Sequence, residues 1–191
     1  MSPESQYKEK INFYLNSLDE LGEVLINQEG STGITKAVLR IILGTMMASK
    51  GAIIGIKRTR CNILSAQGVK TDSTDFKIHR SQKEDLLKYK NSNLSKTQLN
   101  KLFDPKDKNA ISNFFKMLNP SIIVPLFHKD NLLGIVALSK KFTGEAYNAV
   151  DKNVLEIICN HLTDSLYNLS LIHISEPTRR TPSSYAVFCL K

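Results

Sequence analysis

Cysteine is scarce in this chain and scattered along it. The three cysteines, Cys61, Cys159 and Cys189, form no CxxC pair, and no histidine stands at the spacing typical of a zinc site. An odd and dispersed set of cysteines suits a reducing compartment rather than a disulfide framework. Cys159 falls beside the apolar stripe of a predicted helix, where a thiol behaves as a small hydrophobe. We therefore expect no metal site and a buried, structural role for Cys159.

Long apolar runs are also missing, as are tracts dominated by acidic residues or by glycine and proline. No run reaches the ~20 residues that a helix needs to cross a bilayer, and residues 1–4 begin a polar segment rather than a signal peptide. Hydrophobic residues make up 41% of the 191 residues, which is enough for one core in one domain of ordinary size. The sequence therefore predicts a folded, cytoplasmic protein with no membrane partner.

Positive charge exceeds negative charge, with a net charge of +8 and a sequence pI of about 9.4. The densest basic cluster is Lys57-Arg58-Thr59-Arg60. Such an excess permits binding to nucleic acid but does not require it. No motif that reads RNA or DNA and no aromatic platform accompanies the charge. Nucleic acid is therefore not an expected partner, and a basic nucleic-acid-binding protein stays an alternative.

Three stretches have the periodicity of amphipathic helices, over residues 11–27, 34–46 and 154–169. Gly30 ends the first stretch, and Asp151 suits the N-terminus of the last because a negative charge is favourable there. Apolar residues seven apart in the terminal helices would allow these helices to pair with a second copy of the chain. These residues are Ile11, Leu18 and Leu25 in the first helix, and Leu155, Leu162 and Leu169 in the last.

Residues 51–57 and 61–66 are β-rich and flank a basic turn, which predicts a hairpin. Residues 69–119 are less periodic and are interrupted by Asn-Ser and Asp-Pro loop signals. In this middle segment the sequence predicts short helices at 82–89, 96–103 and 110–118.

A second hairpin is predicted within SIIVPLFHKDNLLGIVALSKK, residues 121–141, because two apolar runs flank the polar residues 128–131. A hairpin with one solvated face would alternate apolar and polar residues, whereas these runs are apolar at both odd and even positions. We therefore expect both strands in the middle of a sheet, covered by a layer on each side. One face is expected to carry Ile122, Val124, Leu126, Leu132, Val136 and Leu138, and the other Ile123, Pro125, Phe127, Leu133, Ile135 and Ala137.

The composition changes after Leu169. Residues 175–184 resemble a linker, and LIHISEPTRR…SYAVFCLK is similar to translated sequencing-adapter sequence. We therefore divide the chain into one domain at residues 1–170 and an artefactual or disordered tail at residues 171–191. A linker into a truncated output domain is the other interpretation.

The order helix, helix, hairpin, irregular middle, hairpin, long helix resembles that of a GAF domain over residues 1–170. The apolar-Pro-Leu strand at 124–126, the stretch 133–138, and Tyr147, Asp151 and Leu155 are similar to the family pattern. The resemblance implies an α+β fold, with a central antiparallel sheet, the N- and C-terminal helices on one face, and an irregular segment that forms a pocket on the other.

The resemblance also implies a sensory or regulatory role, because GAF domains often sense cyclic nucleotides, tetrapyrroles or other metabolites. Cyclic-nucleotide-binding members carry an Asn-Lys, Phe, Asp-Glu constellation, where this chain has Ser139-Lys140, Tyr147 and Asp151-Lys152. Asn and Glu are missing and Tyr replaces Phe, so the resemblance identifies no cofactor or ligand. The candidate ligand-binding residues are Phe76, Ile78, Phe103, Phe114, Leu118, Pro125, Leu138, Lys140, Tyr147 and Asp151.

Two functional hypotheses follow. The first is a GAF-type module that binds a small ligand, dimerises through its terminal helices, or does both, and transmits a signal to an output domain missing from this chain. The second is a ligand-free dimerisation scaffold of a signalling protein. No combination of nucleophile, base and orienting group emerges, so an enzyme is not expected.

Overall fold

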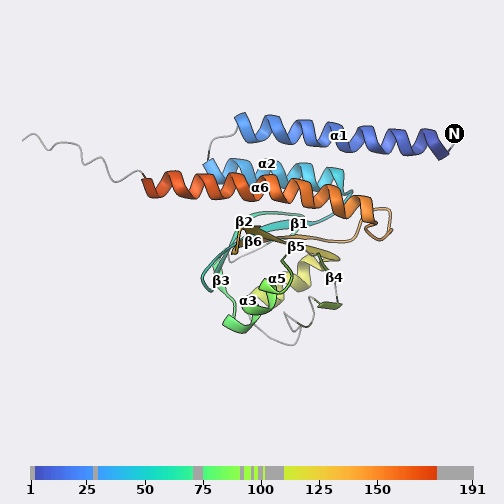
Figure 1. Ribbon diagram of the computed structural model, residues 1–191. Helices are drawn as coiled ribbons and strands as arrows, with labels where there is room; N and C mark the ends of the chain where they lie inside the picture. The colour runs from blue at the N-terminus through green and yellow to red at the C-terminus, as the bar shows by residue number, and fades with distance from the viewer. Residues whose placement is uncertain are drawn as a thin grey trace, which may run out of the picture.

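The computed structural model describes residues 3–27, 30–70, 75–90, 93–95, 97–98, 101 and 110–175. Its centre is a six-stranded antiparallel sheet in the order β3-β2-β1-β6-β5-β4 (Figure 1). The strands are β1 (Gly51–Lys57), β2 (Arg60–Gln67), β3 (Asp75–Lys77), β4 (Leu94–Ser95), β5 (Ile122–His128) and β6 (Asn131–Leu138). The two predicted hairpins, β1–β2 and β5–β6, are confirmed. The edge strands β3 and β4 were not predicted, because two or three residues are too few to show a period of two.

The β5–β6 hairpin is buried on both faces, as its pattern predicted. Ile122, Val124 and Leu126 lie in a core cluster on one side of the sheet, whereas Ile123 and Ile135 lie in a second cluster on the other. Central position in the sheet therefore explains why neither face of this hairpin is polar.

The predicted face of Leu132 was wrong. Between Leu126 and Phe127 the register shifts by one residue, so that Leu132 pairs with Phe127 while Leu126 pairs with Gly134. This bulge moves Leu132 to the face of Phe127, in the second cluster. A bulge of one residue reverses the faces beyond it, which alternation alone does not indicate.

Helices cover both faces of the sheet (Figure 1). α2 (Gly30–Thr45) and α6 (Ala149–Ser175) lie directly on one face, and α1 (Pro3–Asn27) packs on them as an outer layer. α3 (Arg80–Leu87) and α5 (Ala110–Leu118) lie on the opposite face. The expected α+β arrangement, with the terminal helices on one side, is confirmed. The helix predicted at 96–103 falls largely outside the described residues.

The apolar stripe of α6 faces the core of its own chain. Leu155 and Leu162 are fully buried, and Leu169 packs against the same cluster from a partly buried position. The seven-residue spacing in α6 is therefore accounted for by packing within the chain. No helix among the described residues is long and apolar enough to cross a membrane.

α6 continues to Ser175, beyond the predicted domain boundary at residue 170. Residues 176–191 lie outside the described residues, so the proposed tail stays a prediction.

Both described cysteines are buried. Burial raises the pKa of Cys61 to about 12, although the charge of Lys83 opposes the shift. Burial, and to a smaller extent the charge of Glu156, also raises the pKa of Cys159. Both thiols are therefore protonated at neutral pH, and the expected structural role of Cys159 agrees with its position in the core.

Candidate functional site

The first turn of α6 is closed by two residues that cap each other. The side-chain oxygen of Asn148 accepts a hydrogen bond from the N–H of Asp151 at 2.9 Å. The carboxylate of Asp151 in turn accepts one from the N–H of Asn148, also at 2.9 Å. This reciprocal pair satisfies N–H groups that the helix itself leaves without partners, and the negative charge suits this end of the helix dipole.

The same carboxylate binds two residues from distant parts of the chain. Nζ of Lys141 lies 2.5 Å from one carboxylate oxygen, and the hydroxyl of Tyr14 donates to the other at 2.5 Å. Lys141 follows β6 and forms a β-bridge with Ala48, whereas Tyr14 belongs to the buried stripe of α1. Asp151 therefore joins the first helix, the end of the last strand and the start of the last helix.

This network carries charge into the protein interior, since Lys141 is 6% exposed and Asp151 only 1% exposed. Burial alone favours the neutral form of Asp151 and is the largest single influence on its pKa. Together, the hydrogen bonds from Lys141, Tyr14 and the Asn148 N–H outweigh this effect of burial, so the pKa of Asp151 lies below its ordinary value. Burial, followed by the hydrogen bond to Asp151, raises the pKa of Tyr14. Asp151 is therefore ionised at neutral pH, with Tyr14 as a neutral donor.

Tyr147 connects the network to the protein surface. Its hydroxyl donates to the backbone oxygen of Ser139 at 2.6 Å, and its ring centre lies 5.4 Å from Nζ of Lys141. Burial, and then the charge of Asp151, raises the pKa of Tyr147, so its hydroxyl stays neutral and can donate. The side chain of Tyr147 is thus held by contacts of both its hydroxyl and its ring.

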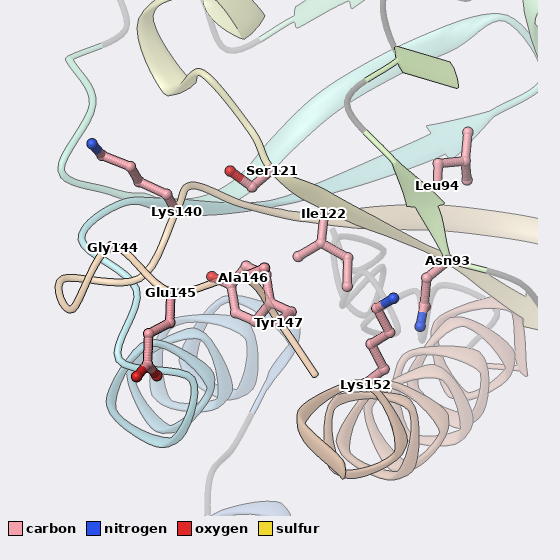
Figure 2. A pocket seen from close by; sticks show the side chains of 10 residues that line it. All are labelled: Asn93, Leu94, Ser121, Ile122, Lys140, Gly144, Glu145, Ala146, Tyr147 and Lys152. Carbon is pink, nitrogen blue, oxygen red and sulfur yellow. The ribbon is translucent and has the colours of Figure 1, made fainter. Parts of the chain in front are cut away.

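Beside Tyr147 lies an open cavity of about 340 Å³ at the end of the sheet where β4 pairs with β5 (Figure 2). Figure 2 shows Lys152 extending from α6 toward Asn93 and Ile122, while the ammonium group of Lys140 points away from them. The residues that line the cavity are Asn93, Leu94, Ser121, Ile122, Lys140, Gly144, Glu145, Ala146, Tyr147 and Lys152. We call this space the α6 cavity.

A second hollow, of about 430 Å³, lies on the other side of the buried network, between α1 and the segment after β6. Tyr14, Lys141 and Asp151 line it, and Glu145 borders both hollows. The Tyr14–Asp151–Lys141 network therefore lies in the wall of the second hollow and not in that of the α6 cavity.

The structure does not bring the ten sequence-predicted site residues together. Lys140, Tyr147 and Asp151 lie at or beside the α6 cavity. Leu138 is buried in the core below the helices, and Pro125 lies in β5 beyond the two residues that β4 pairs. Phe103 is outside the described residues. The remaining four, Phe76, Ile78, Phe114 and Leu118, are buried in the cluster on the opposite face of the sheet, where the rings of Phe76 and Phe114 are 6.2 Å apart.

Two residues of the network were missed by the sequence analysis. The resemblance assigned the family lysine to Lys140, but the lysine paired with Asp151 is Lys141. Successive side chains of an extended segment point to opposite sides, so one of two adjacent lysines had to face inward, and the sequence does not indicate which. The signal for Tyr14 was its hydroxyl within an otherwise apolar stripe, which requires a buried partner.

No family sequence model matches the chain, and no curated protein matches it. Solved structures do match. The GAF domain of a Coxiella burnetii phosphoenolpyruvate-protein phosphotransferase has a TM-score of 0.64 and 9% identity, covering 84% of this chain and 96% of that one. The corresponding Acinetobacter domain has a TM-score of 0.60 and 9% identity, covering 93% and 99%.

A third similar structure is the GAF domain of a putative sensor histidine kinase from Pseudomonas syringae pv. tomato. Its TM-score is 0.57 and its identity 14%, over 91% of this chain and 97% of that one. Each match covers nearly the whole of the other domain. The chain therefore has the fold of a GAF domain.

Proposed function

We propose that this chain is a regulatory, non-catalytic module of the GAF type, which binds a small ligand in the α6 cavity and passes the change to α1 and α6. The observation that carries the proposal is the position of Asp151, whose carboxylate joins α1, α6 and the end of β6. A shift at the start of α6 would alter all three contacts together.

The chemistry of the α6 cavity favours a small molecule with an anionic group. Its volume of about 340 Å³ falls near the lower end of small-molecule sites. Asn93, Ser121 and Lys152 supply side-chain hydrogen-bond donors, whereas Ile122 and Leu94 supply apolar surface. A compact ligand with a carboxylate or phosphate on an apolar body would accept hydrogen bonds from the donors and pack against the apolar surface.

Tyr147 supplies the connection between such a ligand and the helices. It lines the α6 cavity, and its ring lies against the ammonium of Lys141, which pairs with Asp151. A ligand that shifts Tyr147 would therefore bias the buried ion pair and, through Tyr14, the position of α1.

A thermal-shift screen of cyclic nucleotides, tetrapyrroles, amino acids and small carboxylates tests the ligand. A compound present at about 100 times its Kd stabilises the folded state by ~2.7 kcal/mol, which raises the unfolding midpoint by about 5–10 °C. Lys152→Gln is expected to abolish that rise, because the ammonium is the cavity's cationic donor. Lys36→Gln, an exposed lysine on α2, removes the same charge elsewhere and is expected to preserve it. A rise of equal size in Lys152→Gln would place the ligand outside the α6 cavity.

The exposed face of α1 favours dimerisation as a second candidate function. α1 is the outermost layer of the molecule (Figure 1). Along it, Leu15 is 53% exposed and Ile26 84% exposed, and both lie on one stripe with Ile11 and Gly22 because their spacings are four and seven residues. We propose that this stripe, rather than the leucines of α6, contacts a second copy.

Sedimentation at micromolar concentration tests the dimer. The unmodified chain is expected to sediment as a dimer, and Leu15→Glu with Ile26→Glu as a monomer, because the two carboxylates would be buried without partners. Leu87→Glu places one such carboxylate on α3, at the opposite side of the molecule, and is expected to leave the dimer intact. A monomeric unmodified chain would exclude this function.

A further inference from the structure

Three positively charged residues form a row across the strands at the other end of the sheet. Lys57 at the end of β1 pairs with Arg60 at the start of β2, and Arg60 pairs with Lys77 at the end of β3. Directly opposite residues of antiparallel strands carry their side chains on the same face. The register therefore places three cations side by side on one face, and we call them the cationic row.

Such a row is unfavourable unless something neutralises it. Side chains of opposite residues start only about 4.5–5.5 Å apart, and like charges in that position are destabilising. All three side chains are exposed, and within the described part of the chain none of them forms an ion pair. The charge is thus available to a ligand.

The row borders a cavity of about 470 Å³. Asn62 and Asp75 pair with each other one step further along the same face and complete its polar lining. The buried residues Cys61 and Phe76 also border the cavity. Gly55 stands opposite Asn62 and has no side chain, and the side chains of Asn62 and Leu64 occupy the space where its Cβ would lie. The site therefore presents three cations and an amide against a single carboxylate.

β3 and β4 are the two edges of the sheet (Figure 1). Residues of β3 line this cavity and Leu94 of β4 lines the α6 cavity, so the two cavities lie at opposite edges. The two sites share no residue. The two sites can therefore be tested by separate substitutions.

We infer that the cationic row binds a small molecule with two or more linked phosphate groups. Arg60 stands in the centre, where its planar guanidinium can hold two phosphate oxygens at once, and the flanking lysines act as point charges. Neighbouring strands are ~4.8 Å apart, so the row spans about 10 Å. A single phosphate reaches two of the three cations, whereas a chain of phosphates reaches all of them.

The lining favours a small ligand over a nucleic acid strand. Proteins that bind single strands combine basic grooves with exposed aromatic rings on which bases stack. The aromatic residue in this lining, Phe76, is buried in the core, and the carboxylate of Asp75 would repel a phosphate backbone that continued past the row.

Calorimetric titration of the full chain with inorganic tripolyphosphate tests the inference. Tripolyphosphate is expected to bind, orthophosphate to bind at least about tenfold more weakly, and added salt to raise the Kd of tripolyphosphate. Arg60→Gln is expected to raise that Kd by about tenfold or more, because charged hydrogen bonds are lost. Lys57→Gln combined with Lys77→Gln should have a similar effect while Arg60 remains.

Lys36→Gln is the charge-matched control and should bind tripolyphosphate like the unmodified chain, whereas Lys152→Gln tests whether the α6 cavity binds it instead. The inference is overturned if tripolyphosphate does not bind, if Arg60→Gln binds it equally well, or if Lys152→Gln loses as much affinity. It is also overturned if a short single-stranded oligonucleotide binds more tightly than tripolyphosphate and depends on Arg60, since the row would then serve nucleic acid. Circular dichroism of each variant checks the fold.

Discussion

Replacing Asp151 by asparagine is expected to lower the free energy of unfolding by about 3–5 kcal/mol, because it leaves the buried ammonium of Lys141 without its counter-ion. Asparagine is close in size, but its single oxygen can replace only one of the two carboxylate oxygens, of which one accepts from Tyr14 and the other from Lys141 and the Asn148 N–H. The loss therefore reports the charge and one set of hydrogen bonds rather than the size of the side chain. Urea unfolding followed by circular dichroism measures it.

The double variant Lys141→Met with Asp151→Asn is the matched control. Methionine fills most of the space of the lysine stem and removes the stranded charge, so most of the lost stability should return. Two outcomes would contradict the buried ion pair: a loss below about 1 kcal/mol in Asp151→Asn, or a double variant no more stable than the single one.

The pH dependence of stability gives an independent test. The folded-state pKa of Asp151 lies below its ordinary value, so its contribution to stability is complete above that ordinary value, about pH 4. The contribution is lost as the pH falls through the folded-state pKa. The difference in free energy of unfolding between the unmodified chain and Asp151→Asn should therefore be constant from pH 7 to about pH 5 and shrink below about pH 4. A difference that shrinks near neutral pH would assign the effect to another group.

Gly134→Ala is expected to destabilise the protein by about 3 kcal/mol, because a Cβ at this position would lie 2.4 Å from the backbone oxygen of Ile54. Gly134 pairs with Gly55 where β6 meets β1, in the middle of the sheet. The obstructing atom belongs to the main chain, so a change of side-chain rotamer cannot relieve the overlap, and the two strands would have to separate locally.

Gly44→Ala in α2 is the control for the change from glycine to alanine. Apart from its chain neighbours and the adjacent helix backbone, no atom lies within 4 Å of a Cβ added there, and alanine favours a helix over glycine by ~0.5–1 kcal/mol. Gly44→Ala should therefore be neutral or stabilising in the same urea titration. Equal midpoints for the two variants would contradict the close approach of β1 and β6.

The sequence was sufficient for the layers of the fold, as the β5–β6 hairpin illustrates. Apolar residues at both odd and even positions require cover on both sides, and the structure supplies α2 and α6 on one face and α5 on the other. The seven-residue spacing in α6 was interpreted as a possible dimer contact. A seven-residue spacing of apolar residues is compatible both with packing in a core and with packing against a second copy. In α6, Leu155 and Leu162 pack in the core of their own chain.

The candidate site was predicted only in fragments. Tyr147 and Asp151 were identified through the family resemblance; Tyr147 precedes α6, and Asp151 lies in its first turn. The partners of Asp151 were not identified. Tyr14 is 137 residues away in sequence, and Lys141 is distinguished from Lys140 only by the direction of its side chain.

What the sequence alone determined is the set of elements and their order, because helix and strand periodicity are properties of a local stretch of chain. What only the tertiary structure decided is which side chains from different stretches meet: Tyr14 with Asp151, Lys141 rather than Lys140 in the interior, and Arg60 between Lys57 and Lys77. These contacts and neighbours depend on strand register and helix packing, which are set by the burial of the whole core rather than by any single segment.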